Sequence, residues 1–181
     1  MTGSRRNRLQ EIDRARLSPL QEEVLTRLEQ RRGRIVSPYK VWLHTPRIAE
    51  GMEVVGTGLN KESALSLAEL EIAVLSTAVF WNSPYVINNH TRHALKSGLG
   101  QPVVDAILAG ETVTINDPRL QLVADFVHDA LVGKGSIEDA AFDTYERELG
   151  RTVIAELLVA IGYYTSVALA MRFHEATPNA D

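Results

Sequence analysis

Hydrophobic residues along the chain recur at the three- and four-residue spacing of amphipathic α-helices, and no stretch alternates between apolar and polar residues as a half-buried strand would. Helix starts are marked by prolines that directly follow a small capping residue, where a missing N–H costs little. These are Ser18-Pro19, Thr45-Pro46, Ser83-Pro84 and Asp117-Pro118. Helix ends are marked by glycines, which favour the left-handed conformation just past a helix. These are Gly33, Gly98, Gly133 and Gly150.

These helix start and end signals predict an all-α helical bundle without strands. The expected helices cover residues 18 to 32, 46 to 55, 61 to 80, 84 to 97, 102 to 109, 118 to 132, 137 to 149 and 152 to 174. Two of them, 61 to 80 and 152 to 174, are apolar on nearly all sides and should be central. The run from Val153 to Met171 approaches membrane-span length, but Glu156 and two tyrosines within it favour a buried core helix.

Two polar residues are expected on the buried faces of consecutive helices. At the helical spacing, Glu71 falls among Leu67, Val74, Leu75 and Ala78, whereas Glu69 falls on the narrow polar face with Ser66, Ser76 and Thr77. His90 falls between Val86, Ile87 and Ala94. The two helices are separated only by Trp81, Asn82 and Ser83, so they should form an antiparallel hairpin. We therefore expect Glu71 and His90 to meet as a buried pair.

Such a pair has two interpretations. The two side chains can simply satisfy each other as core polar groups do. Alternatively, the carboxylate orients the imidazole and favours its protonated form, and the second ring nitrogen exchanges protons with a substrate. Periodicity does not separate these alternatives.

Composition limits the chemistry further. The 181 residues are 45% hydrophobic and contain no cysteine, which excludes disulfides, thiolate nucleophiles and thiolate metal sites. The other histidines show no HExxH or similar ligand spacing, so we expect neither a metal nor another cofactor. No apolar segment follows the early arginines, so we expect a cytoplasmic protein without a secretory signal.

The net charge of −4 is unevenly distributed, because residues 1 to 34 hold nine arginines and five acidic residues. We expect a solvated basic tail at 1–16, one helical domain at 17–175 and a short tail at 176–181. Nucleic-acid and membrane partners are not expected.

The spacing of the hairpin residues resembles the signature of the carboxymuconolactone decarboxylase-like superfamily, which includes the alkyl hydroperoxidase D-like proteins. That signature has a glutamate, a CxxC pair and a histidine, and the same positions here are Glu71, Ser83, Val86 and His90. Other stretches are similar as well. They are HTRHALKSGL at 90–99, ELLVAIGYYTSVALA at 156–170 and RIVSPYKVWLHTP at 34–46.

The resemblance implies an all-α bundle that assembles as a homo-oligomer, commonly a trimer or hexamer, with pockets near subunit contacts. It also implies that His90 and Glu71 form the catalytic pair. Ser83 and Val86 cannot replace the redox cysteines, so peroxide reduction through a thiol pair is excluded. Decarboxylases of the superfamily often carry a glutamate where this chain has Val86. Candidate pocket residues are Ser83, Val86, Trp81, Tyr85, Tyr39, His44 and Tyr163.

Two functional hypotheses follow. The first is a cofactor-free, non-redox enzyme in which His90 performs acid–base chemistry on a small carboxylated or carbonyl-bearing molecule, as in decarboxylation or a related lyase or isomerase reaction. The alternative is a non-catalytic binding or scaffolding protein that has lost the redox thiols.

Overall fold

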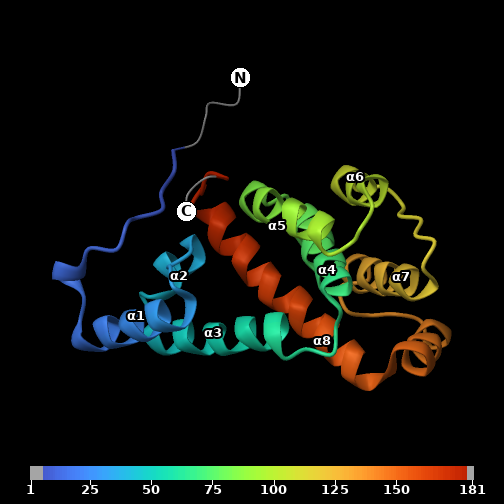
Figure 1. Cartoon of the computed structure of the whole chain (residues 1–181), viewed down its shortest axis with the longest axis horizontal. Coiled ribbons are helices and arrows are strands. Elements are labelled where there is room, and N and C mark those ends of the chain that lie inside the picture. Colours follow the sequence, from blue (N-terminus) through green and yellow to red (C-terminus); the bar gives the residue numbers. More distant parts are fainter. Residues whose placement is uncertain (1–5, 179–181) are drawn as a thin grey trace.

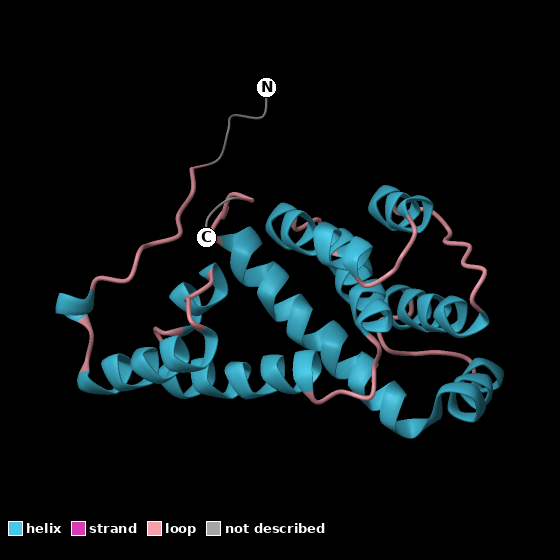
Figure 2. Cartoon of the chain, in the orientation of Figure 1, coloured by secondary structure: helices cyan, strands magenta, loops and turns pink. Residues whose placement is uncertain are grey.

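The computed structural model describes residues 6–178, which contain helices and loops but no strand (Figures 1 and 2). The all-α prediction is therefore confirmed. After a short 3₁₀ turn at Arg14–Arg16, the helices are α1 (Pro19–Arg32), α2 (Ser37–Trp42), α3 (Pro46–Lys61), α4 (Leu67–Phe80), α5 (Pro84–Lys96), α6 (Gln101–Ala109), α7 (Pro118–Val132) and α8 (Asp139–Phe173).

Helix α4 lies at the centre of the C-terminal half and packs against α5, α6, α7 and α8. Ile72, Val74 and Leu75 have no exposed surface, as expected of a helix that is apolar on all sides. Its predicted start at residue 61 is wrong. The helix begins at Leu67, where Ser66 and Glu69 form a capping box.

The prediction that Glu69 faces solvent is also wrong. Only 2% of Glu69 is exposed, and its carboxylate accepts hydrogen bonds from Ser66 N and from Arg119 Nε at 2.6 Å. Thr77, expected on the same polar face, is fully buried. The reason is that α7 and α6 cover the face of α4 that periodicity assigned to water.

Two features of the N-terminal half were missed. Helix α2 was not predicted, although Ser37-Pro38 matches the start signal used elsewhere. Helix α3 continues to Lys61 instead of ending near residue 55. Gly56 lies inside the helix, and Tyr163 packs directly against it. A Cβ at Gly56 would be 2.6 Å from the Tyr163 hydroxyl.

Helix α8 bends sharply at Gly150, whose φ of 78° and ψ of 159° are not helical. The predicted break between 149 and 152 is thus confirmed. Gly133 differs from the expectation, since it ends α7 with an ordinary φ of −74°. A glycine is needed at this position because the Cβ of any other residue would lie 2.1 Å from the Ser136 carbonyl oxygen.

By length and composition, α8 alone among the helices described could cross a membrane, a test that core helices of globular proteins also pass. Here α8 runs diagonally through the molecule, with α1, α2 and α3 on one side and α4 to α7 on the other (Figure 1). It contacts α2, α3, α4, α5 and α7. Leu157, Ala160 and Ala168 are fully buried, but only 33% of the most apolar window of α8 is buried, so the helix is a core helix on one face only.

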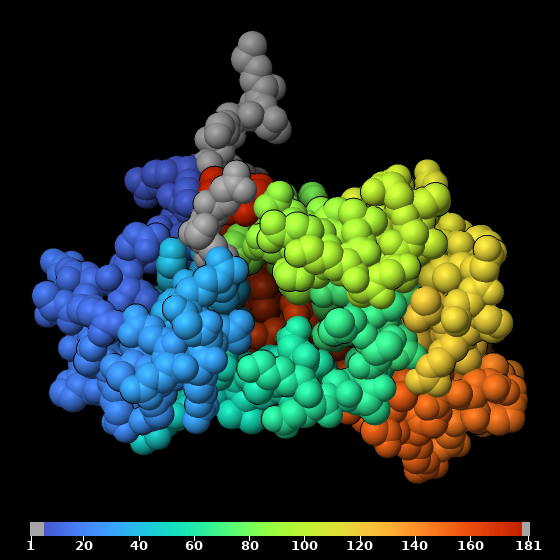
Figure 3. Space-filling view, viewed as in Figure 1, coloured from blue at the N-terminus to red at the C-terminus, as the bar shows by residue number. Residues whose placement is uncertain are grey.

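The two sides do not close over α8 along its whole length. In the space-filling view, a hollow between α3 and α5 exposes atoms of α8 at its floor (Figure 3).

The loop before α4 is attached to α8 by hydrogen bonds. Glu156 of α8 accepts them from Ser63 Oγ at 2.7 Å and from Ala64 N at 2.8 Å.

Within the predicted tail, residues described by the structure contact the domain. The backbone N–H of Arg8 donates to the His174 carbonyl at 2.7 Å, and Arg14 forms ion pairs with Glu22 and Glu29 of α1. Leu9 and Ile12 pack against the core. Arg5 lies outside the described residues, and the domain limits at 17 and 175 stay predictions.

Candidate functional site

Glu71 of α4 and His90 of α5 lie side by side in the interhelical hairpin. His90 Nδ1 is 3.0 Å from Glu71 Oε2 and 3.3 Å from Oε1. Glu71 is 6% exposed, and the side chain of His90 is 20% exposed. The predicted pair is therefore confirmed as a contact. Glu71 is closed off from water, whereas His90 still reaches solvent.

This contact determines which nitrogen of His90 is available. An ionised carboxylate can only accept hydrogen bonds, so Nδ1 carries the hydrogen and donates to Glu71. In the neutral ring, Nε2 then bears the lone pair. Nε2 has no hydrogen-bond partner among the residues the structure describes. It is the atom that can give or take a proton.

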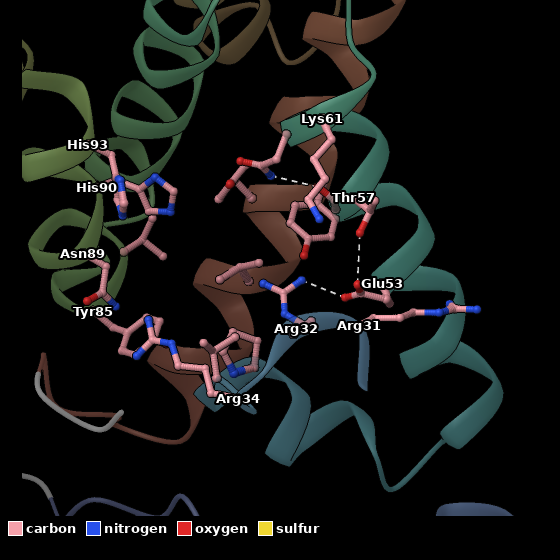
Figure 4. A pocket seen from close by; sticks show the side chains of 18 of the residues that line it. Arg31, Arg32, Arg34, Glu53, Thr57, Lys61, Tyr85, Asn89, His90 and His93 are labelled. Carbon is pink, nitrogen blue, oxygen red and sulfur yellow. Dashed lines mark hydrogen bonds and ion pairs between the residues drawn. The ribbon is translucent and has the colours of Figure 1, made fainter. Parts of the chain in front are cut away.

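Aromatic residues fix the orientation of the His90 ring. Tyr164 of α8 packs edge-on against it, with ring centroids 5.1 Å apart. The His93 ring, one turn further along α5, is 5.6 Å away. Partial burial, and then the neighbouring His90, lower the pKa of His93. Both rings form one wall of a cavity (Figure 4).

The cavity has a volume of about 420 Å³, the size of a small-molecule site, and opens to solvent between α5 and α3. Tyr85 and Val86 line it on the His90 side, and Tyr163, Tyr164 and Val167 of α8 line its floor. The wall opposite His90 is formed by the end of α1, the connection to α2 and the second half of α3.

Glu53 of α3 organises that opposite wall. Only 2% of it is exposed, and its carboxylate accepts hydrogen bonds from Arg32 Nη1 at 2.7 Å, the Tyr39 hydroxyl at 2.7 Å and Thr57 Oγ1 at 3.0 Å. Burial alone would raise the pKa of Glu53. The hydrogen bonds from Arg32 and Tyr39 outweigh burial and hold its pKa below the ordinary glutamate value. Burial also raises the pKa of Tyr39, so that its hydroxyl keeps its proton and donates.

The cavity is strongly cationic. Glu53 is the only carboxylate that lines it among the residues described, whereas five cationic residues border it. These are Arg31, Arg32, Arg34, Lys61 and Arg92. Only Arg32 forms an ion pair with a described carboxylate. The site therefore favours ligands that carry negative charge.

The structure brings together some of the predicted pocket residues. Tyr85, Val86 and Tyr163 line the cavity together with His90. Their assignment to substrate binding stays a prediction. The four others do not line this cavity, and their placement corrects the expectation.

Each of these four is held elsewhere for a structural reason. Ser83 is fully buried at the start of α5 and borders a smaller cavity of about 190 Å³, where its hydroxyl has no described partner. Trp81 donates from Nε1 to Thr165 Oγ1 at 3.0 Å. Tyr39 stands behind Glu53 and supports it, while His44 is exposed past the end of α2.

Sequence reasoning missed the whole wall opposite His90. One signal was present, since Ala49, Glu53, Gly56 and Leu59 share one face of α3 and three of them are small or apolar. An acid on that stripe indicates a buried, paired carboxylate. Nothing local to Arg32, Arg34 or Lys61 distinguishes them from solvated surface residues.

No protein-family model matches the sequence, and no curated protein matches it significantly. Solved structures do match in fold. One is a crystal structure of an uncharacterized peroxidase-related protein from Silicibacter sp. TM1040, which superposes with a TM-score of 0.76 over 99% of this chain and 96% of that chain. The fold is of the alkyl hydroperoxidase D-like type. The sequences are only 16% identical, so the likeness shows a shared architecture and assigns no activity.

Proposed function

We propose that this protein is a cofactor-free enzyme that uses His90 as a general acid or base on a small carboxylated or carbonyl-bearing molecule. The observation that carries the proposal is that the two nitrogens of the imidazole ring have different surroundings. Nδ1 is 3.0 Å from the buried Glu71 carboxylate, while Nε2 is left without a described partner on a ring that lines the cavity. A histidine held in this way is oriented for proton transfer.

Decarboxylation or a related lyase or isomerase reaction suits this arrangement. Loss of carbon dioxide next to a carbonyl leaves the bonding electron pair on the substrate as an enolate. The His90 imidazolium can donate its Nε2 proton to the enolate carbon, and the neutral ring then regains a proton from water. Glu71 holds the plane of the ring through its contact with Nδ1.

The charge of the cavity supports an acidic substrate. Cationic groups opposite His90 can bind a carboxylate and place the reacting carbon near Nε2. Chemistry at a thiol pair has no basis in this chain, which contains no cysteine. The structural neighbour is a peroxidase-related protein, and that relation is not carried over to this chain.

The alternative is a binding or scaffolding protein in which Glu71 and His90 only satisfy each other. The low exposure of Glu71 is consistent with this alternative, because a buried carboxylate in a purely structural pair is also closed off from water. The two proposals differ in what happens when the pair is broken.

The test is a screen of small keto acids and lactones with wild type, His90→Ala and Glu71→Gln, in which substrate loss is followed by mass spectrometry. Removal of the proton-transfer group should reduce kcat by about 10²- to 10⁴-fold in His90→Ala. Glu71→Gln should reduce kcat less, because it leaves the imidazole in place and weakens only the contact that orients it. His44→Gln changes an exposed histidine outside the cavity and serves as the matched control.

Wild-type turnover that both site variants retain in full would show that the site is misassigned. If no substrate is turned over and His90→Ala changes only ligand affinity or stability, the binding-protein alternative is supported.

A further inference from the structure

Three cations face the histidine wall from the other side of the cavity. Arg32 comes from the end of α1, Arg34 from the connection to α2 and Lys61 from the end of α3. Figure 4 shows Arg32 opposite His90 and Lys61 above it, while the side chain of Arg34 starts below Arg32 and extends toward Tyr85. Arg31 belongs to the same turn of α1, but its side chain points away from this space (Figure 4).

The charge on this wall is only partly balanced. Glu53 is ion-paired with Arg32 Nη1 at 2.7 Å, so its charge is already compensated. Arg34 and Lys61 have no carboxylate partner among the residues the structure describes. About two positive charges therefore remain uncompensated on the side of the cavity that faces His90.

Arg32 is also held in place before any ligand arrives. Its guanidinium is fixed by Glu53 and stands 5.0 Å from the centre of the Tyr39 ring. In Figure 4 one edge of the guanidinium points toward Glu53 and the other toward the cavity. A fixed fork of donors binds an oxyanion with little loss of side-chain entropy.

We infer that this wall, formed by Arg32, Arg34 and Lys61, binds a dianionic phosphate group of the substrate. A phosphate monoester carries close to two negative charges and three acceptor oxygens, which matches two uncompensated cations and the free edge of Arg32. A single carboxylate supplies one charge and two oxygens. The substrate class is then a small phosphorylated carbonyl compound, with the phosphate on this wall and the reacting carbon beside His90.

The identity of the reacting end rests on the proposed function, whereas the phosphate site does not. It can be measured as binding without turnover. The probe is inorganic phosphate at about pH 8, where the dianion predominates. Malonate and acetate at equal ionic strength are compared with it by calorimetry, because screening alone alters surface electrostatics.

Wild type should bind phosphate saturably and more tightly than malonate or acetate. Arg34→Gln and Lys61→Gln should each weaken phosphate binding by about tenfold or more, since each removes a charge-assisted hydrogen bond. Both residues are exposed, so the variants should fold, which circular dichroism checks. Arg31→Gln makes the same charge change on the same turn and should alter the affinity by less than about twofold.

Three results would overturn the inference. They are the absence of saturable phosphate binding, tighter binding of malonate than of phosphate, and an equal loss of affinity in Arg31→Gln, which would indicate a diffuse field instead of a site. His90→Gln separates the two proposals. It should reduce turnover as His90→Ala does and leave phosphate affinity within about twofold, because His90 lies on the opposite wall.

Discussion

At the scale of single residues, three glutamates are buried in the part of the chain that the structure describes, and each has a different basic partner. Glu53 is paired with Arg32, Glu69 with Arg119 and Glu71 with His90. A buried carboxylate needs such a partner, because its desolvation is otherwise too costly. Arginine stays charged at any pH a protein tolerates, so the first two pairs persist for as long as the carboxylate is ionised. The third partner is an imidazole, the one group of the three whose second nitrogen can serve in proton transfer.

Glu53 should make stability depend on pH on the acid side. Its pKa is lower in the folded protein than in the unfolded chain. Its contribution is therefore complete above the ordinary glutamate pKa of 4.5 and is lost as the pH falls through the lower folded value. Urea unfolding of Glu53→Gln should show a weaker loss of stability below that pH than wild type.

At neutral pH, Glu53→Gln should lower the free energy of unfolding by about 2 kcal/mol, because it weakens the hydrogen bonds from Arg32 and Tyr39. Glu50→Gln is the matched control on the same helix, since the Glu50–Arg27 pair is closer to solvent and should cost less than about 1 kcal/mol. Equal losses in the two variants would contradict the account of Glu53.

At the scale of the elements, the cavity depends on how closely α3 approaches α8. Gly56 allows this approach, because the Tyr163 hydroxyl lies where its Cβ would be. Tyr163 cannot easily move aside, since its ring packs against Trp42 at 6.0 Å and Tyr164 at 5.2 Å. Tyr164 in turn packs against His90, so α3 and the catalytic candidate are linked through two tyrosines.

Alanine at two glycines of α3 should have opposite effects. Gly56→Ala forces Tyr163 or α3 to shift and should destabilise the protein by about 1 to 3 kcal/mol. Gly58→Ala meets no atom within 4 Å and should stabilise the helix by about 0.5 to 1 kcal/mol. Thermal and urea unfolding of both variants measure this. Destabilisation of similar size in both would mean that the helix does not approach Tyr163 as described.

At the scale of the whole molecule, many large apolar side chains remain at the surface. On α8 these include Leu158 and Val159, each about half exposed, and on α3 they include Val54, which is 62% exposed. Apolar surface of this kind is typical of contacts between subunits. We propose that the chain forms a homo-oligomer, as its resemblance to the decarboxylase-like superfamily implies.

Light scattering should therefore give a mass that is a multiple of 20.0 kDa. Leu158→Glu should shift the protein toward the monomer, because a charge at a desolvated contact is costly. Thr152→Glu, at an exposed polar position of the same helix, should not. A wild-type protein that runs at 20.0 kDa at all concentrations would contradict this proposal.

The sequence alone determined the features that depend on neighbours along the chain. Helix starts at Pro19, Pro46, Pro84 and Pro118 follow from local hydrogen bonding and fixed φ angles. The contact between Glu71 and His90, 19 positions apart, follows from periodicity across one short turn. The tertiary structure decided everything that joins distant segments.

Glu69 was placed wrongly because only packing by α6 and α7 shows that its face of α4 is covered. Arg32, Arg34 and Lys61 likewise line one cavity with His90 only because α3 and α5 lie on either side of α8. Periodicity shows which side of a helix is polar. It contains no information on whether that side faces water or a cavity, because this depends on contacts between residues far apart in the chain.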